Sequence, residues 1–94
     1  MNLDGDLIEE YLASEGRARK QLLKRVLAAK PDSADATRLA PTLRDPSPRV
    51  AARITALLAR HQLRDVFEQQ LGGLKPGKIA ILRGHFEKIA GPQN

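Results

Sequence analysis

Apolar residues recur at three- and four-residue spacing along almost the whole chain, which is the spacing of an amphipathic α-helix. No stretch of the sequence alternates apolar and polar residues as a half-buried strand does. The pattern therefore predicts an all-α protein of five or six short helices. These helices would pack either as a compact helical bundle or as a small α-solenoid of stacked hairpins.

The N-terminal third contains two apolar stripes with a glycine between them. The stripe positions are Leu7, Ile8, Tyr11 and Leu12, then Leu22, Leu23, Val26 and Leu27. We expect Gly16 to separate two helices and not merely to bend one. The second helix should end at Lys30-Pro31, because the residue before a proline is disfavoured in the α-helical region.

The middle of the chain has the clearest signals for where helices begin. Asp32 or Ser33 can cap a third helix, in which Pro41 removes one backbone hydrogen bond and so predicts a kink. Ser47 is a good N-cap residue, and Pro48 suits the first helical position because its missing N–H would be unpaired there anyway. A fourth helix is therefore expected to begin at Pro48.

The fourth helix has the strongest amphipathic pattern in the chain. Its apolar face contains Val50, Ile54, Leu57, Leu58 and His61, and Leu63, Val66, Phe67 and Leu71 continue the pattern. The spacing predicts helix as far as Gly72-Gly73, a strong C-terminal stop. A last amphipathic helix contains Ile79, Leu82, Phe86 and Ile89. We expect residues 1–90 to form a single domain and residues 91–94 a flexible tail.

Residues 36–58, ATRLAPTLRDPSPRVAARITALL, resemble a HEAT repeat. Such a repeat is a helical hairpin with a kinked first helix, a short Asp-Pro-rich turn and a second helix that opens with Val. Pro41 falls at the kink, Asp45 matches the turn aspartate that can accept backbone N–H groups, and Val50 matches the pinning apolar residue. The family usually places an arginine that hydrogen-bonds between repeats directly after this valine, where the chain has Ala51. The resemblance implies about three hairpins of ~30 residues.

Composition narrows the class of protein further. A chain of 94 residues makes one domain, and the absence of cysteine excludes disulfides and thiolate zinc sites. The acidic start MNLDGDLIEE lacks the basic region of a signal peptide. No apolar run approaches the ~20 residues that span a bilayer. We therefore expect a soluble, cytoplasmic, bacterial-type protein without membrane insertion.

Charge is arranged in blocks that the net charge of +5 conceals. Residues 1–15 carry five acids and no base, and residues 16–30 carry six bases and no acid. Residues 49–64 add four arginines, again without an acid. Local fields of this kind decide which partners approach a protein.

Two rows of these cations are candidate partner-binding residues. If the fourth helix continues to residue 64, one row lies within a ~60° strip beside the apolar face. This row is Arg49, Arg53, Arg60 and Arg64. The second row, opposite the apolar positions of the second helix, is Arg17, Lys20 and Lys24. Guanidinium groups suit both carboxylates and phosphates. The leading hypothesis is a non-catalytic, HEAT-like adaptor that docks an acidic segment of another protein along the row from Arg49 to Arg64. The alternative is that both rows are merely solvated faces.

Two other classes of partner remain open. Nucleic acid is an obvious ligand for basic patches, so a DNA- or RNA-binding module is the main alternative. The three aromatic residues, Tyr11, Phe67 and Phe86, are expected in the core, which leaves no stacking platform for single strands. A faint helix-turn-helix pattern near Gly72 is weakened by Glu68 and Lys78, which occupy unsuitable positions. In the third hypothesis, copies self-associate by pairing acidic residues 1–15 with basic residues 17–30.

Motifs for catalysis, cofactors and metals find little support. Residues 72–78, GGLKPGK, match the phosphate-binding loop, but that loop needs a preceding strand and a Ser or Thr where this chain has Ile79. His61 lies on an apolar helix face, where a buried, hydrogen-bonded or partly exposed histidine is expected. His85 should face solvent, and two distant histidines do not make a metal site. We therefore predict no catalytic, cofactor-binding or metal-binding residues.

Overall fold

The computed structural model describes residues 5–91. These residues form six α-helices, one 3₁₀ helix and no strand, so the all-α prediction is confirmed. The elements are α1 (Gly5–Ala13), α2 (Gly16–Ala28), α3 (Ser33–Leu39), the 3₁₀ helix η1 (Ala40–Arg44), α4 (Pro48–Arg60), α5 (Arg64–Gln69) and α6 (Pro76–Ala90). Of the predicted tail, residues 91–94, only Gly91 belongs to the described residues.

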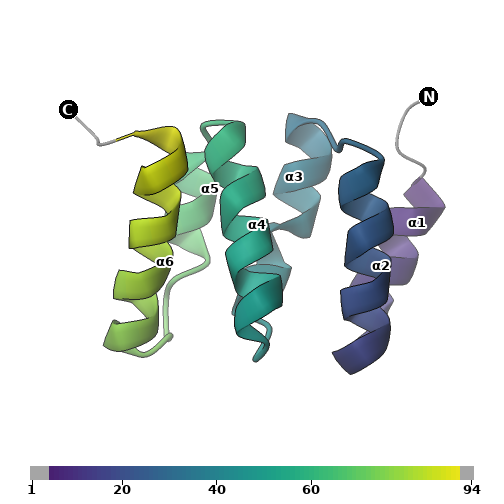
Figure 1. Ribbon diagram of the computed structural model, residues 1–94, viewed down its shortest axis with the longest axis horizontal. Coiled ribbons are helices and arrows are strands. Elements are labelled where there is room, and N and C mark those ends of the chain that lie inside the picture. Colours follow the sequence, from purple (N-terminus) through teal and green to yellow (C-terminus); the bar gives the residue numbers. More distant parts are fainter. Residues whose placement is uncertain (1–4, 92–94) are drawn as a thin grey trace.

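The helices of the described chain are arranged as three neighbouring hairpins in two layers (Figure 1). The front layer in that view contains α2, α4 and α6, and the back layer contains α1, α3 and α5. The principal extents are 36 × 26 × 17 Å, and the shortest fits two helix layers. Because α4 lies between α2 and α6, it contributes to the core along its whole length.

Local chemistry at the first two helices explains their ends. Gly16 begins α2 with a φ of +59°, a left-handed value that glycine adopts without steric cost. It separates α1 from α2, as predicted. At the other end, Lys30 has a φ of 55° and its N–H donates to the Leu27 carbonyl at 3.1 Å. Pro31 follows, and α2 therefore stops close to the predicted position.

The second hairpin also follows its sequence signals. The Asp32 carboxylate caps α3 by accepting the Asp35 N–H at 2.8 Å. The helix tightens into η1 at the residue before Pro41, which is how the predicted kink is realised. Ser47 Oγ accepts the Val50 N–H at 3.4 Å and caps α4.

The predicted continuation of the fourth helix to Gly72 was wrong, because α4 ends at Arg60. The Leu63 N–H donates to the Leu58 carbonyl at 2.9 Å, and the Gln62 N–H donates to the Ala59 carbonyl at 3.1 Å. This pair of bonds is a Schellman motif, in which Gln62 takes the left-handed position with a φ of 57°. Glycine usually fills that position, so a glutamine gave no warning in the sequence.

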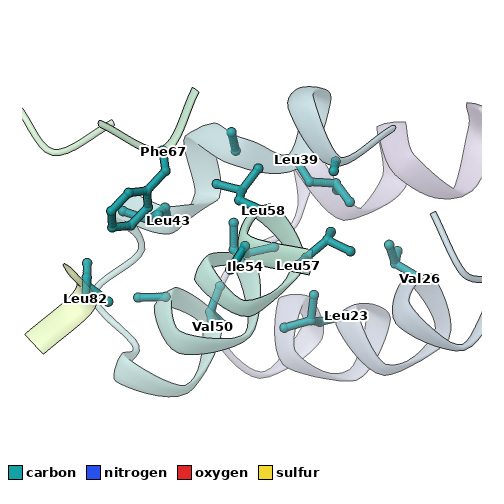
Figure 2. Close-up of a cluster of buried hydrophobic side chains, with 14 of the residues drawn as sticks. Leu23, Val26, Leu39, Leu43, Val50, Ile54, Leu57, Leu58, Phe67 and Leu82 are labelled. Atoms are coloured by element: carbon teal, nitrogen blue, oxygen red, sulfur yellow. The ribbon is translucent and has the colours of Figure 1, made fainter. Parts of the chain in front are cut away.

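A single apolar core runs between the layers and draws on all six α-helices. In Figure 2, Leu57 of α4 points towards Leu23 and Val26 of α2, while Phe67 and Leu82 lie near the opposite end of the cluster. Phe67 and Phe86 stack with ring centroids 4.6 Å apart. No helix among residues 5–91 is long and apolar enough to cross a membrane.

Tyr11 is the third core aromatic, and it is fully buried. Its hydroxyl donates to Thr42 Oγ1 at 2.9 Å. Burial raises the pKa of the Tyr11 phenol above its ordinary value, and the hydrogen bond to Thr42 opposes that rise. All three aromatic residues therefore lie in the core, as expected.

Candidate basic binding surface

Three of the four predicted arginines form a row on α4. Arg49, Arg53 and Arg60 are all exposed, and at about 100° per residue they lie within a strip of about 40°. Since α4 is the middle helix of the front layer (Figure 1), this row lies at the centre of one face of the molecule.

Arg64 does not join that row, which corrects the predicted four-arginine strip. Because α4 ends at Arg60, Arg64 begins α5 in the back layer. Its guanidinium lies over the Phe86 ring, 4.8 Å from the centroid, and Nη2 donates to the Gly91 carbonyl at 3.3 Å. The side chain is half-buried and holds α5 against α6.

The second predicted row lies on α2. Arg17, Lys20 and Lys24 are exposed, on the side of α2 away from the buried Leu23 and Val26, as predicted. Because α2 and α4 are neighbours in the front layer (Figure 1), the two rows share one face. The hairpin topology brings together residues that are about 30 positions apart in sequence.

The boundary between α2 and α4 has a hollow at each end. The first, of about 600 Å³, lies where the two helices begin, and the second, of about 440 Å³, lies where they end. The first is lined by Glu15, Gly16, Arg19, Lys20, Asp45, Pro46 and Ser47. The second is lined by Leu27, Lys30, Pro31, Asp32, Leu57, Arg60 and His61. Lys20 and Arg60 thus line hollows at opposite ends of this boundary.

An ion pair that the sequence analysis missed lies in the first hollow. Arg19 Nη1 is 2.9 Å from Asp45 Oδ2, and Nη2 donates to the Leu12 carbonyl at 3.0 Å. The Asp45 carboxylate also accepts the Ser47 N–H at 2.8 Å. Only 16% of the Arg19 side chain and 9% of the Asp45 side chain are exposed. The sequence indicates the partial burial of Arg19, because Arg19 precedes Leu22 and Leu23 at the spacing of the buried stripe, but it does not indicate Asp45 as the partner.

His61 lines the second hollow and makes two hydrogen bonds. Its Nε2 lies 3.0 Å from the Pro31 carbonyl, and its Nδ1 lies 3.2 Å from Ser33 Oγ. A carbonyl can only accept, so Nε2 carries a proton, and in the neutral ring Nδ1 accepts from the serine. His61 is thus hydrogen-bonded and partly exposed, which is within the range expected from the sequence.

Charge on the front layer is almost purely positive along α2 and α4. Neither helix contains an acidic residue. The ion pairs found within residues 5–91 are Arg19–Asp45 and the bridge between Arg83 of α6 and Glu68 of α5. The exposed cations of the two rows take part in neither ion pair, and they have no carboxylate partner among the described residues. We call this set, Arg17, Lys20, Lys24, Arg49, Arg53 and Arg60, the front basic surface.

Other candidate chemistry lies away from this surface. Residues 5–91 contain no cluster of three or more His, Asp or Glu side chains that could hold a metal. The glycine-rich segment before α6 follows a helix, and Lys78 Nζ donates to the Asp45 carbonyl at 3.2 Å. His85 is exposed on α6, as predicted. The acids Glu9 and Glu10 are exposed on α1 in the back layer, where α1 packs against its own α2.

Similarity to known proteins does not assign a function to this surface. Comparison of the chain with protein-family models, curated proteins and solved structures finds no match. Guanidinium and ammonium groups on one face can pair with carboxylates or phosphates.

Proposed function

We propose that the chain is a non-catalytic binding module that docks an acidic segment of another protein on the front basic surface. The observation that carries this proposal is the convergence of six exposed cations from two neighbouring helices that contain no acid. An acidic segment lying across α2 and α4 would meet positive charge on both helices.

The spacing of the arginines supports a protein ligand. Arg49 and Arg53 are four residues apart on α4, and Arg53 and Arg60 are seven apart, so their Cα atoms rise about 6 Å and 10 Å along the helix. Each guanidinium can bind a carboxylate through two parallel hydrogen bonds. An exposed pair contributes only about 0–1 kcal/mol. Affinity would therefore come from several pairs acting together, and it would weaken with salt.

We interpret the stack of hairpins as HEAT-like, with support from one long-range contact. Arg19 is the fourth residue of α2, and Ala51 is the fourth residue of α4. The arginine that the family usually has after its valine is therefore missing from α4 but has a counterpart one hairpin earlier. That counterpart pairs with the turn aspartate Asp45 of the next hairpin at 2.9 Å. A contact between repeats of the kind that the resemblance implies is thus available here.

A DNA- or RNA-binding module is the second candidate, because the same cations suit a phosphate backbone. The burial of Tyr11, Phe67 and Phe86 removes base-stacking platforms from the described residues, which disfavours single strands. Duplexes are the nucleic-acid ligand that this surface fits best.

The two functions separate in a titration by fluorescence anisotropy. A labelled polyglutamate peptide and a labelled DNA duplex are each titrated at about 50 mM and 200 mM salt. We expect saturable binding of the peptide and weaker, non-specific binding of the duplex. The double variant Arg53→Glu/Arg60→Glu should abolish peptide binding while the helical circular dichroism signal is unchanged.

The matched control is Arg38→Glu/Lys75→Glu. It makes the same change in net charge, but Arg38 is exposed on α3 in the back layer and Lys75 is exposed just before α6. This control should bind the peptide with at least half the wild-type affinity. Equal losses in both double variants would mean that net charge alone drives binding and would refute a defined surface. Light scattering of the wild type over a concentration series tests self-association in parallel.

A further inference from the structure

A second groove lies on the other side of α4, between the first residues of α4 and the first half of α6. Its hollow has a volume of about 290 Å³. The lining is mainly apolar and consists of Pro46, Pro48, Ala51, Ala52, Lys78, Ile81, Leu82 and His85. Ile81 is 64% exposed, the largest exposure of any bulky apolar residue in the described chain.

The shape of this groove follows from side-chain size. On the α4 side, Ala51 and Ala52 are small, so they leave room above the contact with α6. On the α6 side, Leu82 is buried whereas the neighbouring Ile81 projects at the rim. A singly exposed isoleucine is ordinary on a protein surface. Here it borders a hollow that other apolar side chains line.

The groove lies directly beside the arginine row. On α4, Ala52 is about 60° from Arg49 and about 100° from Arg53 around the helix axis, on the side that lines the hollow with Ile81. The apolar lining thus lies beside Arg49 and Arg53 at the start of α4, and the arginine row continues beyond it to Arg60. Lys78, which lines the groove, donates a hydrogen bond to the Asp45 carbonyl. The cations beside the groove that remain to pair with a ligand are therefore those of the arginine row.

Resting on the proposed function, we infer that the docked segment is an amphipathic helix whose apolar residues enter the α4–α6 groove and whose acidic residues face Arg49, Arg53 and Arg60. Helices that bind in grooves use apolar anchors three, four and seven residues apart. Acidic residues at four- and seven-residue spacing on the same helix would match the arginines. The hollow, below the ~300–1,000 Å³ of small-molecule pockets, takes one or two apolar side chains.

Charge complementarity selects this occupant over nucleic acid. A phosphate backbone would engage the arginines but has no apolar group to place against Ala52 and Ile81. Only a ligand with apolar and acidic strips side by side uses both features. The groove therefore adds specificity to a surface that would otherwise bind any polyanion.

The test uses two labelled peptides of about 18 residues, long enough to run the length of α4. Both contain the same leucines and glutamates. In the patterned peptide the leucines form one helical stripe flanked by glutamates, and in the permuted peptide the stripe is scattered. Each is titrated against the wild type, Ile81→Ser, Arg53→Glu/Arg60→Glu, and the control Ile89→Ser. Ile89 is 44% exposed on the same helix but does not line the hollow.

We expect the patterned peptide to bind about tenfold more tightly than the permuted one, the effect of burying one large apolar side chain. Ile81→Ser should remove that tenfold difference, Ile89→Ser should keep it, and Arg53→Glu/Arg60→Glu should weaken both peptides. Equal binding of the two peptides, unaffected by Ile81→Ser, would overturn the amphipathic helix and leave the acidic partner standing. Binding of duplex DNA alone, or of nothing, would overturn both proposals.

Discussion

Within the front layer, α4 has a junction with α6 on one side and a junction with α2 on the other. The two junctions are held by different kinds of contact. Towards α6, the helices pack closely through buried apolar side chains, and Phe86 of α6 stacks on Phe67 of α5 behind them. Towards α2, apolar contact through Leu57 is supplemented by polar contacts at both ends. These are the Arg19–Asp45 pair and the hydrogen bonds of His61. The junction with α6 depends mainly on packing and has one polar bond, from Lys78 Nζ to the Asp45 carbonyl. The junction with α2 has polar bonds at both ends.

This difference determines where each junction is vulnerable. Apolar packing tolerates changes of pH and salt but not loss of volume. A largely buried ion pair fails when one partner is removed, because the remaining charge stays desolvated. Substitutions at the two junctions should therefore differ in size and in response to solution conditions.

The largest effect is expected from Phe86→Ala at the apolar side. Phe86 is 1% exposed and has Phe67 stacked at 4.6 Å and the Arg64 guanidinium 4.8 Å from its centroid. Its loss leaves a cavity, and the free energy of unfolding should fall by about 3–5 kcal/mol. Urea denaturation followed by circular dichroism measures this. A loss below about 1 kcal/mol would contradict a tightly packed junction.

The next effect is expected from Asp45→Ala at the polar junction. The substitution leaves the Arg19 guanidinium without its carboxylate and the Ser47 N–H without its acceptor. The free energy of unfolding should therefore fall by about 1–3 kcal/mol, a range that allows for the solvent that reaches the hollow. The double variant with Arg19→Met should recover part of the loss, because no charge is then left unpaired. Strict additivity in this double-mutant cycle would show that the two residues do not interact.

A gain in stability is expected where α4 ends. Gln62 has a φ of 57°, and a left-handed conformation costs a non-glycine residue roughly 1–2 kcal/mol. Gln62→Gly should therefore raise the free energy of unfolding by about 1 kcal/mol. Lys30 has a φ of 55° at the end of α2, so Lys30→Gly should give a similar gain in the free energy of unfolding. Thermal denaturation of both variants shows whether the two helix ends are equivalent although their junctions differ.

The smallest effect is expected from the exposed pair between α5 and α6. Arg83 donates to both oxygens of Glu68, at 2.7 and 3.1 Å, and this lowers the pKa of the Glu68 carboxyl. The stabilisation is present above the unfolded-state pKa of about 4.3 and is lost as pH falls through the lower folded-state pKa. The Tm difference between wild type and Glu68→Gln should therefore shrink to nothing in acid. A difference that persisted there would assign the effect to something other than the charge.

Local chemistry made much of the fold predictable. Gly16, Asp32 and the pair Ser47-Pro48 each act on the backbone within a few residues, so their effects could be recognised from the sequence alone. The end of α4 could not, because Gln62 occupies a position that glycine usually marks. Because this helix end was misjudged, Arg64 does not lie in the predicted surface row. It begins α5 and contacts Phe86 of α6.

Apart from Arg64, the exposure of the predicted site residues could be inferred from the sequence, but their arrangement on the folded protein could not. The exposure of Arg53 and Lys20 followed from helical periodicity, whereas their presence on one face depends on how the hairpins stack. The Arg19–Asp45 pair joins residues 26 positions apart, and no local pattern reports such a contact. The apolar groove likewise arises from the meeting of Ala52 and Ile81 on separate hairpins.

The bonds of Asp45 affect how cooperatively the protein unfolds. Its carboxylate bonds to Arg19 of the first hairpin and its carbonyl to Lys78 of the third. Where helical hairpins pack side by side, cooperativity depends on the strength of contacts between neighbouring hairpins. Because Asp45 is bonded to both neighbouring hairpins, the opening of one hairpin breaks a bond to another and so costs more free energy. Amide hydrogen exchange should therefore report one unfolding unit that extends from α1 to α6.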